Sequence, residues 1–122
     1  MQFADNGATV VVADTNLGNA QKVVDEIARL RSGNATNQGK ALSIKVNVTK
    51  YSAVEKLIQQ TVSTFGKLDI MVNNAGIGPS YLKTHEATMR DWNRVISVNQ
   101  TGAFYGIKLT FNNLYSKVME IL

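Results

Sequence analysis

The stretch Leu68-Asp69-Ile70-Met71-Val72-Asn73-Asn74-Ala75-Gly76 decides the fold that we expect for this chain. Its first five residues are mostly apolar and include two β-branched residues, which predicts a short central strand. The four that follow are polar or small, as is typical where a strand runs into a loop. Small residues at such a place let a ligand or another backbone approach closely. This stretch therefore predicts a strand that ends at a binding site.

A strand followed by a helix precedes this stretch. The run Thr9–Ala13 is apolar on both faces, as expected of a buried parallel strand, and it ends at Asp14. Apolar residues then recur at helical spacing from Leu17 until Gly33 closes the helix. Gly7, ahead of the strand, is typical of the left-handed cap that ends a helix. The order is therefore helix end, strand and helix.

The same pattern repeats once more before the central strand. Residues 32–40 are rich in Asn, Gly and Thr and predict an exposed loop. Apolar and polar residues alternate over 41–48, which favours a strand that is wet on one face or lies at a sheet edge. A helix follows, with Ser52 and Glu55 as its expected capping box and Gly66 at its end. Strands thus alternate with helices.

The last helix is expected to begin at Thr88, with Asp91 completing a second capping box. Its inward stripe is predicted to carry Trp92, Val95, Ile96, Asn99 and Ala103. Strands separated by helices of this length form a parallel, doubly wound sheet. We therefore predict an α/β fold, a partial Rossmann-like sheet of three strands with helices on both faces. Ligands of such sheets bind beyond the carboxyl ends of the strands.

Composition and charge narrow the function. The net charge is +4, but the 13 Lys and Arg residues include no run of three, so a nucleic-acid partner is not expected. Cysteine is absent, which excludes a disulfide scaffold and a thiolate metal site. No apolar run approaches the roughly 20 residues that span a bilayer, and no signal peptide is visible. We expect a soluble, cytoplasmic protein without membrane partners.

Residues from about 3 to 108 resemble the short-chain dehydrogenase/reductase family. The resemblance rests on the strand that ends in Asn73-Asn74-Ala75-Gly76 and on Asn99-Gln100-Thr101-Gly102 in the following helix. It implies an NAD(P)-dependent oxidoreductase that transfers hydride between a nicotinamide and a secondary alcohol or ketone. It also implies that the intact protein is a homo-oligomer. The alternative is a non-catalytic nucleotide-binding or interaction protein on the same half-fold.

Asp14, Asn47 and Val48 are the candidate residues for the adenosine half of the cofactor. A carboxylate at the position of Asp14 accepts hydrogen bonds from both ribose hydroxyls and repels a 2′-phosphate, which favours NAD over NADP. Alternatively, Asp14 only caps the next helix. The resemblance implies that the pair Asn47 and Val48 contacts the adenine, Val48 through its backbone. The family has Asp where this chain has Asn47, and the other interpretation of Asn47 is a polar residue on an edge strand.

Asn74, Ala75, Gly76 and Asn99 are the candidates near the nicotinamide. The resemblance implies that Asn74 contacts the cofactor, while Ala75 and Gly76 leave room for it; the motif also steadies the sheet. Asn99 is the one catalytic candidate, because the matching family residue bends its helix and holds a water for a proton relay. The alternative for Asn99 is a core amide satisfied by backbone alone. No metal site is expected, since His85-Glu86 lacks the second His of a zinc motif.

The resemblance also implies parts that this sequence lacks. The family's first strand and its glycine-rich T-G-x-x-x-G-x-G turn are expected just ahead of Met1. The catalytic Ser and Y-x-x-x-K motif are expected after the last helix, and none of the four tyrosines is followed by Lys at the fourth position. We expect residues 1–109 to be a partial NAD(P)-binding domain and 110–122 a divergent tail. The chain is thus predicted to be a fragment, inactive by itself.

Overall fold

The computed structural model describes residues 2–31 and 39–119, without the side chains of 114–119. It divides into two compact units, residues 1–47 and 48–122. The first unit holds α1 (Gln2–Asp5), β1 (Val10–Asp14), α2 (Leu17–Arg31) and β2 (Ala41–Lys45). The second holds α3 (Tyr51–Phe65), the 3₁₀ turn η1 (Thr84–Glu86), α4 (Met89–Ile96), the π-helical turn η2 (Ser97–Thr101) and α5 (Gly102–Met119).

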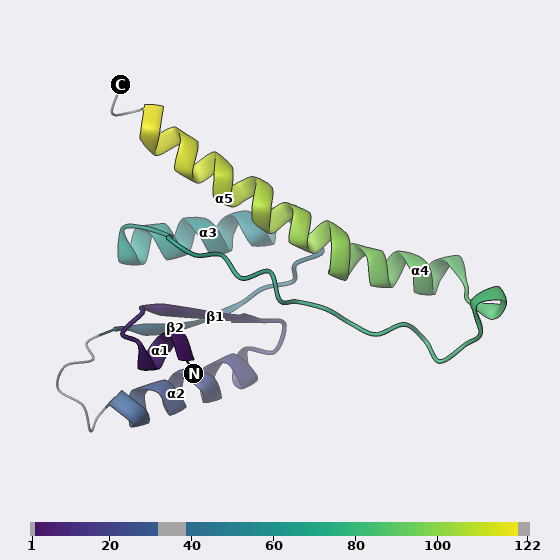
Figure 1. The fold of residues 1–122 in the computed structure, drawn as a ribbon, viewed down its shortest axis with the longest axis horizontal. Helices are drawn as coiled ribbons and strands as arrows, with labels where there is room; N and C mark the ends of the chain where they lie inside the picture. The colour runs from purple at the N-terminus through teal and green to yellow at the C-terminus, as the bar shows by residue number, and fades with distance from the viewer. Residues whose placement is uncertain (1, 32–38, 120–122) are drawn as a thin grey trace. The chain divides into compact units, whose positions relative to one another are not determined.

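The first unit is a β-α-β arrangement. Its strands β1 and β2 are parallel, with a register that runs from Val10 opposite Ala41 to Asp14 opposite Lys45. Helix α2 connects them and packs against both (Figure 1). Its buried residues Ala20 and Ile27 lie on the face predicted from the helical spacing. The predicted strands and helix of this half are therefore confirmed.

Arg31 ties the parts of this unit together. Its guanidinium donates hydrogen bonds to the backbone oxygens of Ala4, Ala8 and Gly39. These three residues lie within α1, before β1 and before β2, respectively. Gly39 fits because it has no side chain, since a Cβ there would lie 2.6 Å from the Ala8 oxygen. Gly7 adopts the predicted left-handed conformation after α1, with φ of 86°.

The second unit is helical. Helix α3 packs against α5 around a core of Val54, Ile58 and Leu109, and half-buried residues surround it, namely Val48, Val62, Leu68 and Tyr105. Gly66 ends α3 with φ of 80°, as predicted. Helices α4 and α5 follow one another through the π turn as one long helical segment (Figure 1).

The predicted third strand is wrong for this structure. Residues 68–72 carry no strand, and the sheet of the described residues has two strands, β1 and β2. A strand exists only where a neighbour completes its hydrogen-bond ladder, and no described segment pairs with 68–72. As a result Ile70 and Val72 are 64% and 60% exposed. The partial α/β fold class holds, with one strand fewer than predicted.

Two smaller predictions were also wrong. Ser52 and Glu55 do not form a capping box, because α3 begins two residues earlier than that pairing requires, with Lys50 at the cap and no side-chain bond. Trp92 is 60% exposed instead of inward. Helical spacing fixes which residues share a face but not whether anything covers that face. The cap of α4 is confirmed, since the Thr88 hydroxyl oxygen accepts from the Asp91 backbone N–H at 3.1 Å.

The predicted loop 32–40 lies almost wholly outside the described residues. The predicted boundary between residues 109 and 110 falls inside α5, and that division stays a prediction. Among the helices that the structure describes, none is long and apolar enough to cross a membrane.

Candidate functional site

Asp14 stands at the carboxyl end of β1 with an exposed side chain. Its Oδ1 accepts from the Asn16 backbone N–H at 2.8 Å and from the Thr15 hydroxyl at 3.4 Å. The cap of α2 is made by Asn16, whose Oδ1 accepts from the Asn19 backbone N–H at 3.2 Å. Asp14 is therefore not needed to cap the helix. Its carboxylate is held at one oxygen and faces solvent.

The parallel register brings two further polar residues to the same sheet edge. Lys45 lies directly opposite Asp14, and the Val46 N–H donates to the Asp14 carbonyl at 2.9 Å. Asn47 follows two residues after Lys45 and is exposed. Asp14, Lys45 and Asn47 thus form a polar edge at the carboxyl ends of β1 and β2. An acceptor carboxylate and an amide suit the hydroxyls and amino group of an adenosine.

Val48 opens the second unit and is half-buried. It contacts Gly102, the first residue of α5, so closely that a Cβ on Gly102 would lie 2.8 Å from the Val48 Cγ2 atom. The absence of a side chain at Gly102 therefore fixes how near Val48 lies to the helix.

Asn73-Asn74-Ala75-Gly76 runs through an exposed, irregular segment. Packing does not require glycine at Gly76, because the nearest atom to an added Cβ would be Asn99 Oδ1, at an ordinary 3.7 Å. Gly76 is exposed, so a ligand can reach its backbone. That is consistent with a backbone that a cofactor approaches closely.

Asn99 makes a two-way contact with the backbone just after this motif. Its Oδ1 accepts from the Ile77 N–H at 2.8 Å, and its Nδ2 donates to the Ile77 carbonyl at 3.0 Å. The prediction that Asn99 faces the interior was wrong, because the residue is exposed. The backbone partners of the alternative interpretation are present. Each side-chain atom keeps further capacity, one lone pair on Oδ1 and one N–H on Nδ2.

Asn99 also lies in the π turn η2, where the helix widens. The Gly102 N–H closes this turn by donating to the Ser97 carbonyl, five residues back. Such turns interrupt the α-helical ladder and are frequent at functional sites. The resemblance implies a bend in the helix at Asn99, and the π turn is the irregularity of the helix at that position.

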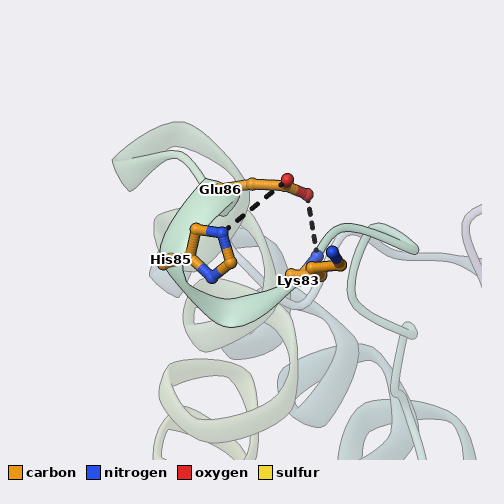
Figure 2. Close-up of polar contacts among 3 residues, drawn as sticks. All are labelled: Lys83, His85 and Glu86. Carbon is orange, nitrogen blue, oxygen red and sulfur yellow. Dashed lines mark hydrogen bonds and ion pairs between the residues drawn. The ribbon is translucent and has the colours of Figure 1, made fainter.

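His85 and Glu86 form no metal centre. In Figure 2 both carboxylate oxygens of Glu86 have a neighbour. Oε1 lies 3.8 Å from the His85 Nε2 atom, and Oε2 accepts from the Lys83 N–H at 3.3 Å. The contact between Glu86 and the Lys83 N–H caps the 3₁₀ turn η1, and the His85 contact joins adjacent residues. Over the described ranges, no group of three or more His, Asp or Glu could hold a metal ion.

The candidates fall into one group in each unit. Asp14 and Asn47 share an edge of the first unit, and Asn99 lies beside the segment of Asn74, Ala75 and Gly76 in the second. Sequence reasoning missed Lys45, which the register places beside Asp14, and it missed Gly102 as the neighbour of Val48. Aligning the two parallel strands end to end could have found Lys45. The close approach of Gly102 is visible only in the folded structure.

The parallel β-α-β arrangement, with polar side chains at the carboxyl ends of its strands, places the chain in the class of Rossmann-like folds. Within that class, the chain belongs to the short-chain dehydrogenase family, which residues 1–119 match. Members of this family are oxidoreductases that bind NAD or NADP.

Three similar proteins illustrate the match. Cyclohexanol dehydrogenase from Acinetobacter sp. (strain SE19) is 41% identical over 105 residues, covering 86% of this chain and 39% of that protein. The solved NAD⁺-bound xylitol dehydrogenase is 26% identical with a TM-score of 0.83, covering 95% and 42% of the two chains. An alcohol dehydrogenase from Thermococcus sibiricus, complexed with 5-hydroxy-NADP, shares the fold at 20% identity and a TM-score of 0.80, covering 92% and 45%. The chain spans about two fifths of each.

Proposed function

We propose that this chain is part of an NAD-linked oxidoreductase that transfers hydride between a secondary alcohol or ketone and the cofactor. The observation that carries the proposal is Asp14, an exposed carboxylate at the end of β1 that α2 does not need as a cap. Its free oxygen suits the ribose hydroxyls of an adenosine. When bound, NAD supplies the acceptor for the hydride.

NAD is proposed over NADP because of the charge of Asp14. A carboxylate accepts charge-assisted hydrogen bonds from two ribose hydroxyls, and it repels a phosphate at the same place. Asn47 can accept from the adenine amino group through its amide oxygen. Val48 contributes its backbone beside the adenine.

The second unit is proposed to serve the nicotinamide side. The small residues Ala75 and Gly76 leave room for the ribose and ring, and Asn74 contacts them. Asn99 holds the backbone of Ile77 and has one remaining amide N–H with which to hold a water. A neutral amide is too weak a base to take the alcohol proton itself. We therefore propose that residues 1–122 alone do not turn over substrate.

A chimera tests this function. The 105-residue stretch of this chain that matches the Acinetobacter cyclohexanol dehydrogenase would replace the homologous segment of that enzyme, which supplies the remainder of a full-length protein. We expect NADH formation with cyclohexanol, and loss of most NAD affinity on Asp14→Ala. A folded chimera that binds no NAD would contradict the proposal. A chimera whose NAD affinity is unchanged by Asp14→Ala would show that Asp14 does not bind the cofactor.

A further inference from the structure

Two buried glycines of α5, Gly102 and Gly106, stand four residues apart and so share one face of the helix. Each leaves room for a residue from another segment. A Cβ on Gly102 would lie 2.8 Å from Val48 Cγ2, 3.0 Å from Val48 Cβ and 3.3 Å from the Val48 carbonyl oxygen. A Cβ on Gly106 would overlap the side-chain oxygen of Asn73.

The two contacts differ in what has to move. At Gly106 the nearest atoms are the ends of the Asn73 and Met71 side chains, which can turn away. At Gly102 rotation about χ1 of Val48 removes only the Cγ2 contact. The Val48 Cβ and carbonyl oxygen are fixed to the main chain. A side chain at Gly102 therefore displaces the backbone of Val48 by a few tenths of an ångström.

Helix α5 is poorly able to yield instead. The Gly102 N–H is bonded to the Ser97 carbonyl, which closes the π turn. The same turn is anchored through both amide atoms of Asn99 to the backbone of Ile77, at 2.8 and 3.0 Å. Movement of Gly102 would strain those bonds, so the displacement falls mainly on Val48.

We propose that Gly102 is a positioning residue for the adenine, acting through the backbone of Val48. The inference rests on the proposed function, in which that backbone lies beside the adenine. Gly102 has no polar side chain and touches no cofactor itself. Its contribution is the close approach that lets the segment after β2 lie where the adenine binds.

The test uses the full-length chimera with Gly102→Ala. AMP carries the adenosine half of NAD, and its Kd is measured by calorimetry beside the KM and kcat for NAD. Displacement of the Val48 backbone weakens its contact with the adenine, and losing about one neutral hydrogen bond should weaken AMP binding and raise the KM for NAD by about threefold to tenfold. We expect kcat to stay near the parent value, because the nicotinamide side is unchanged. Gly78→Ala is the control, since a Cβ there meets nothing within 4 Å.

A second variant separates positioning from general damage. Val48→Gly removes both side-chain atoms that a Cβ on Gly102 would approach, Cγ2 and Cβ, and leaves only the carbonyl contact at 3.3 Å. Combined with Gly102→Ala it should recover part of the AMP affinity, relative to the product of the two single effects. Melting temperatures are measured for every variant. Alanine is the better helix former, so a simple propensity effect would raise the stability of Gly102→Ala.

The outcomes are distinguishable. A parent chimera that does not bind AMP contradicts the proposed function, whatever the glycine variants do. A parent that binds AMP, with Gly102→Ala binding it equally well, overturns the role of Gly102 alone. Equal losses in kcat and AMP affinity that follow the melting temperature, without recovery in the double variant, also overturn it.

Discussion

Replacing Asp14 by Ala in the full-length chimera should reduce the preference for NAD over NADP. Asp14 is exposed, and its Oδ1 is already held by the Asn16 N–H at 2.8 Å, so the carboxylate is oriented without help from the ligand. Hydrogen bonds to a charged group contribute about 1.5–3 kcal/mol, which corresponds to roughly tenfold to a hundredfold in affinity.

The structure favours the lower end of that range. Lys45 lies opposite Asp14 in the register, and its positive charge partly offsets the repulsion of a 2′-phosphate. The exposure of Asp14 also lets solvent screen its charge. We therefore expect Asp14→Ala to lower the NAD/NADP affinity ratio by about tenfold, and Asp14→Asn to do so by a similar factor because the charge is lost.

Titration of the parent and both variants with NADH and NADPH measures this ratio. Asp25→Ala is the charge-matched control: it removes an exposed carboxylate of the same unit, one that accepts from Gln21 within α2. The reasoning is refuted if the parent binds the two cofactors equally. It is also refuted if Asp25→Ala changes the ratio as much as Asp14→Ala does.

Three further predictions concern stability and activity. The 122-residue chain alone should show no cooperative thermal transition and should associate at micromolar concentration. The reason is that Ile70 and Val72 are exposed within residues 68–72, which pair with no described segment. A sharp melt of a monomer in calorimetry and sedimentation would contradict this. The same chain should form no NADH with any secondary alcohol, since no tyrosine precedes a Lys by four residues; saturable turnover that Asn99→Ala abolishes would show otherwise. Gly66→Ala in the chimera should destabilise it by about 1–2 kcal/mol through the left-handed backbone at φ 80°, measured by urea unfolding, whereas an unchanged midpoint would refute the strain.

The sequence predicted best the elements whose signal is local. Helix α3 was predicted from its apolar spacing and from Gly66, and both its buried face and its left-handed end are present. The cap of α4 at Thr88 followed from the type and spacing of two residues. Strands β1 and β2 were predicted from their apolar composition. They form because each pairs with the other in the sheet.

Predictions that depended on absent or distant neighbours were wrong. Residues 68–72 have the composition of a strand, but a strand needs a neighbour that completes its hydrogen-bond ladder, and no described segment pairs with these residues. Trp92 and Asn99 lie on a helical face that was predicted to be inward, yet both are exposed. Periodicity carries no information about what covers a face.

The sequence predicted which residue types belong to the candidate site better than it predicted how those residues are arranged. The motif pointed to Asn74, Gly76 and Asn99, but not to Ile77, because a backbone partner leaves no trace in side-chain identity. The cap of α2 by Asn16, which means that Asp14 is not needed there, likewise became visible only in the folded structure.

A crystal structure of the full-length chimera with NAD tests the central claim most directly. It should place both adenosine ribose hydroxyls within hydrogen-bond distance of the Asp14 carboxylate and the adenine beside the Val48 backbone. An adenosine bound elsewhere, with Asp14 in contact with solvent alone, would contradict the account.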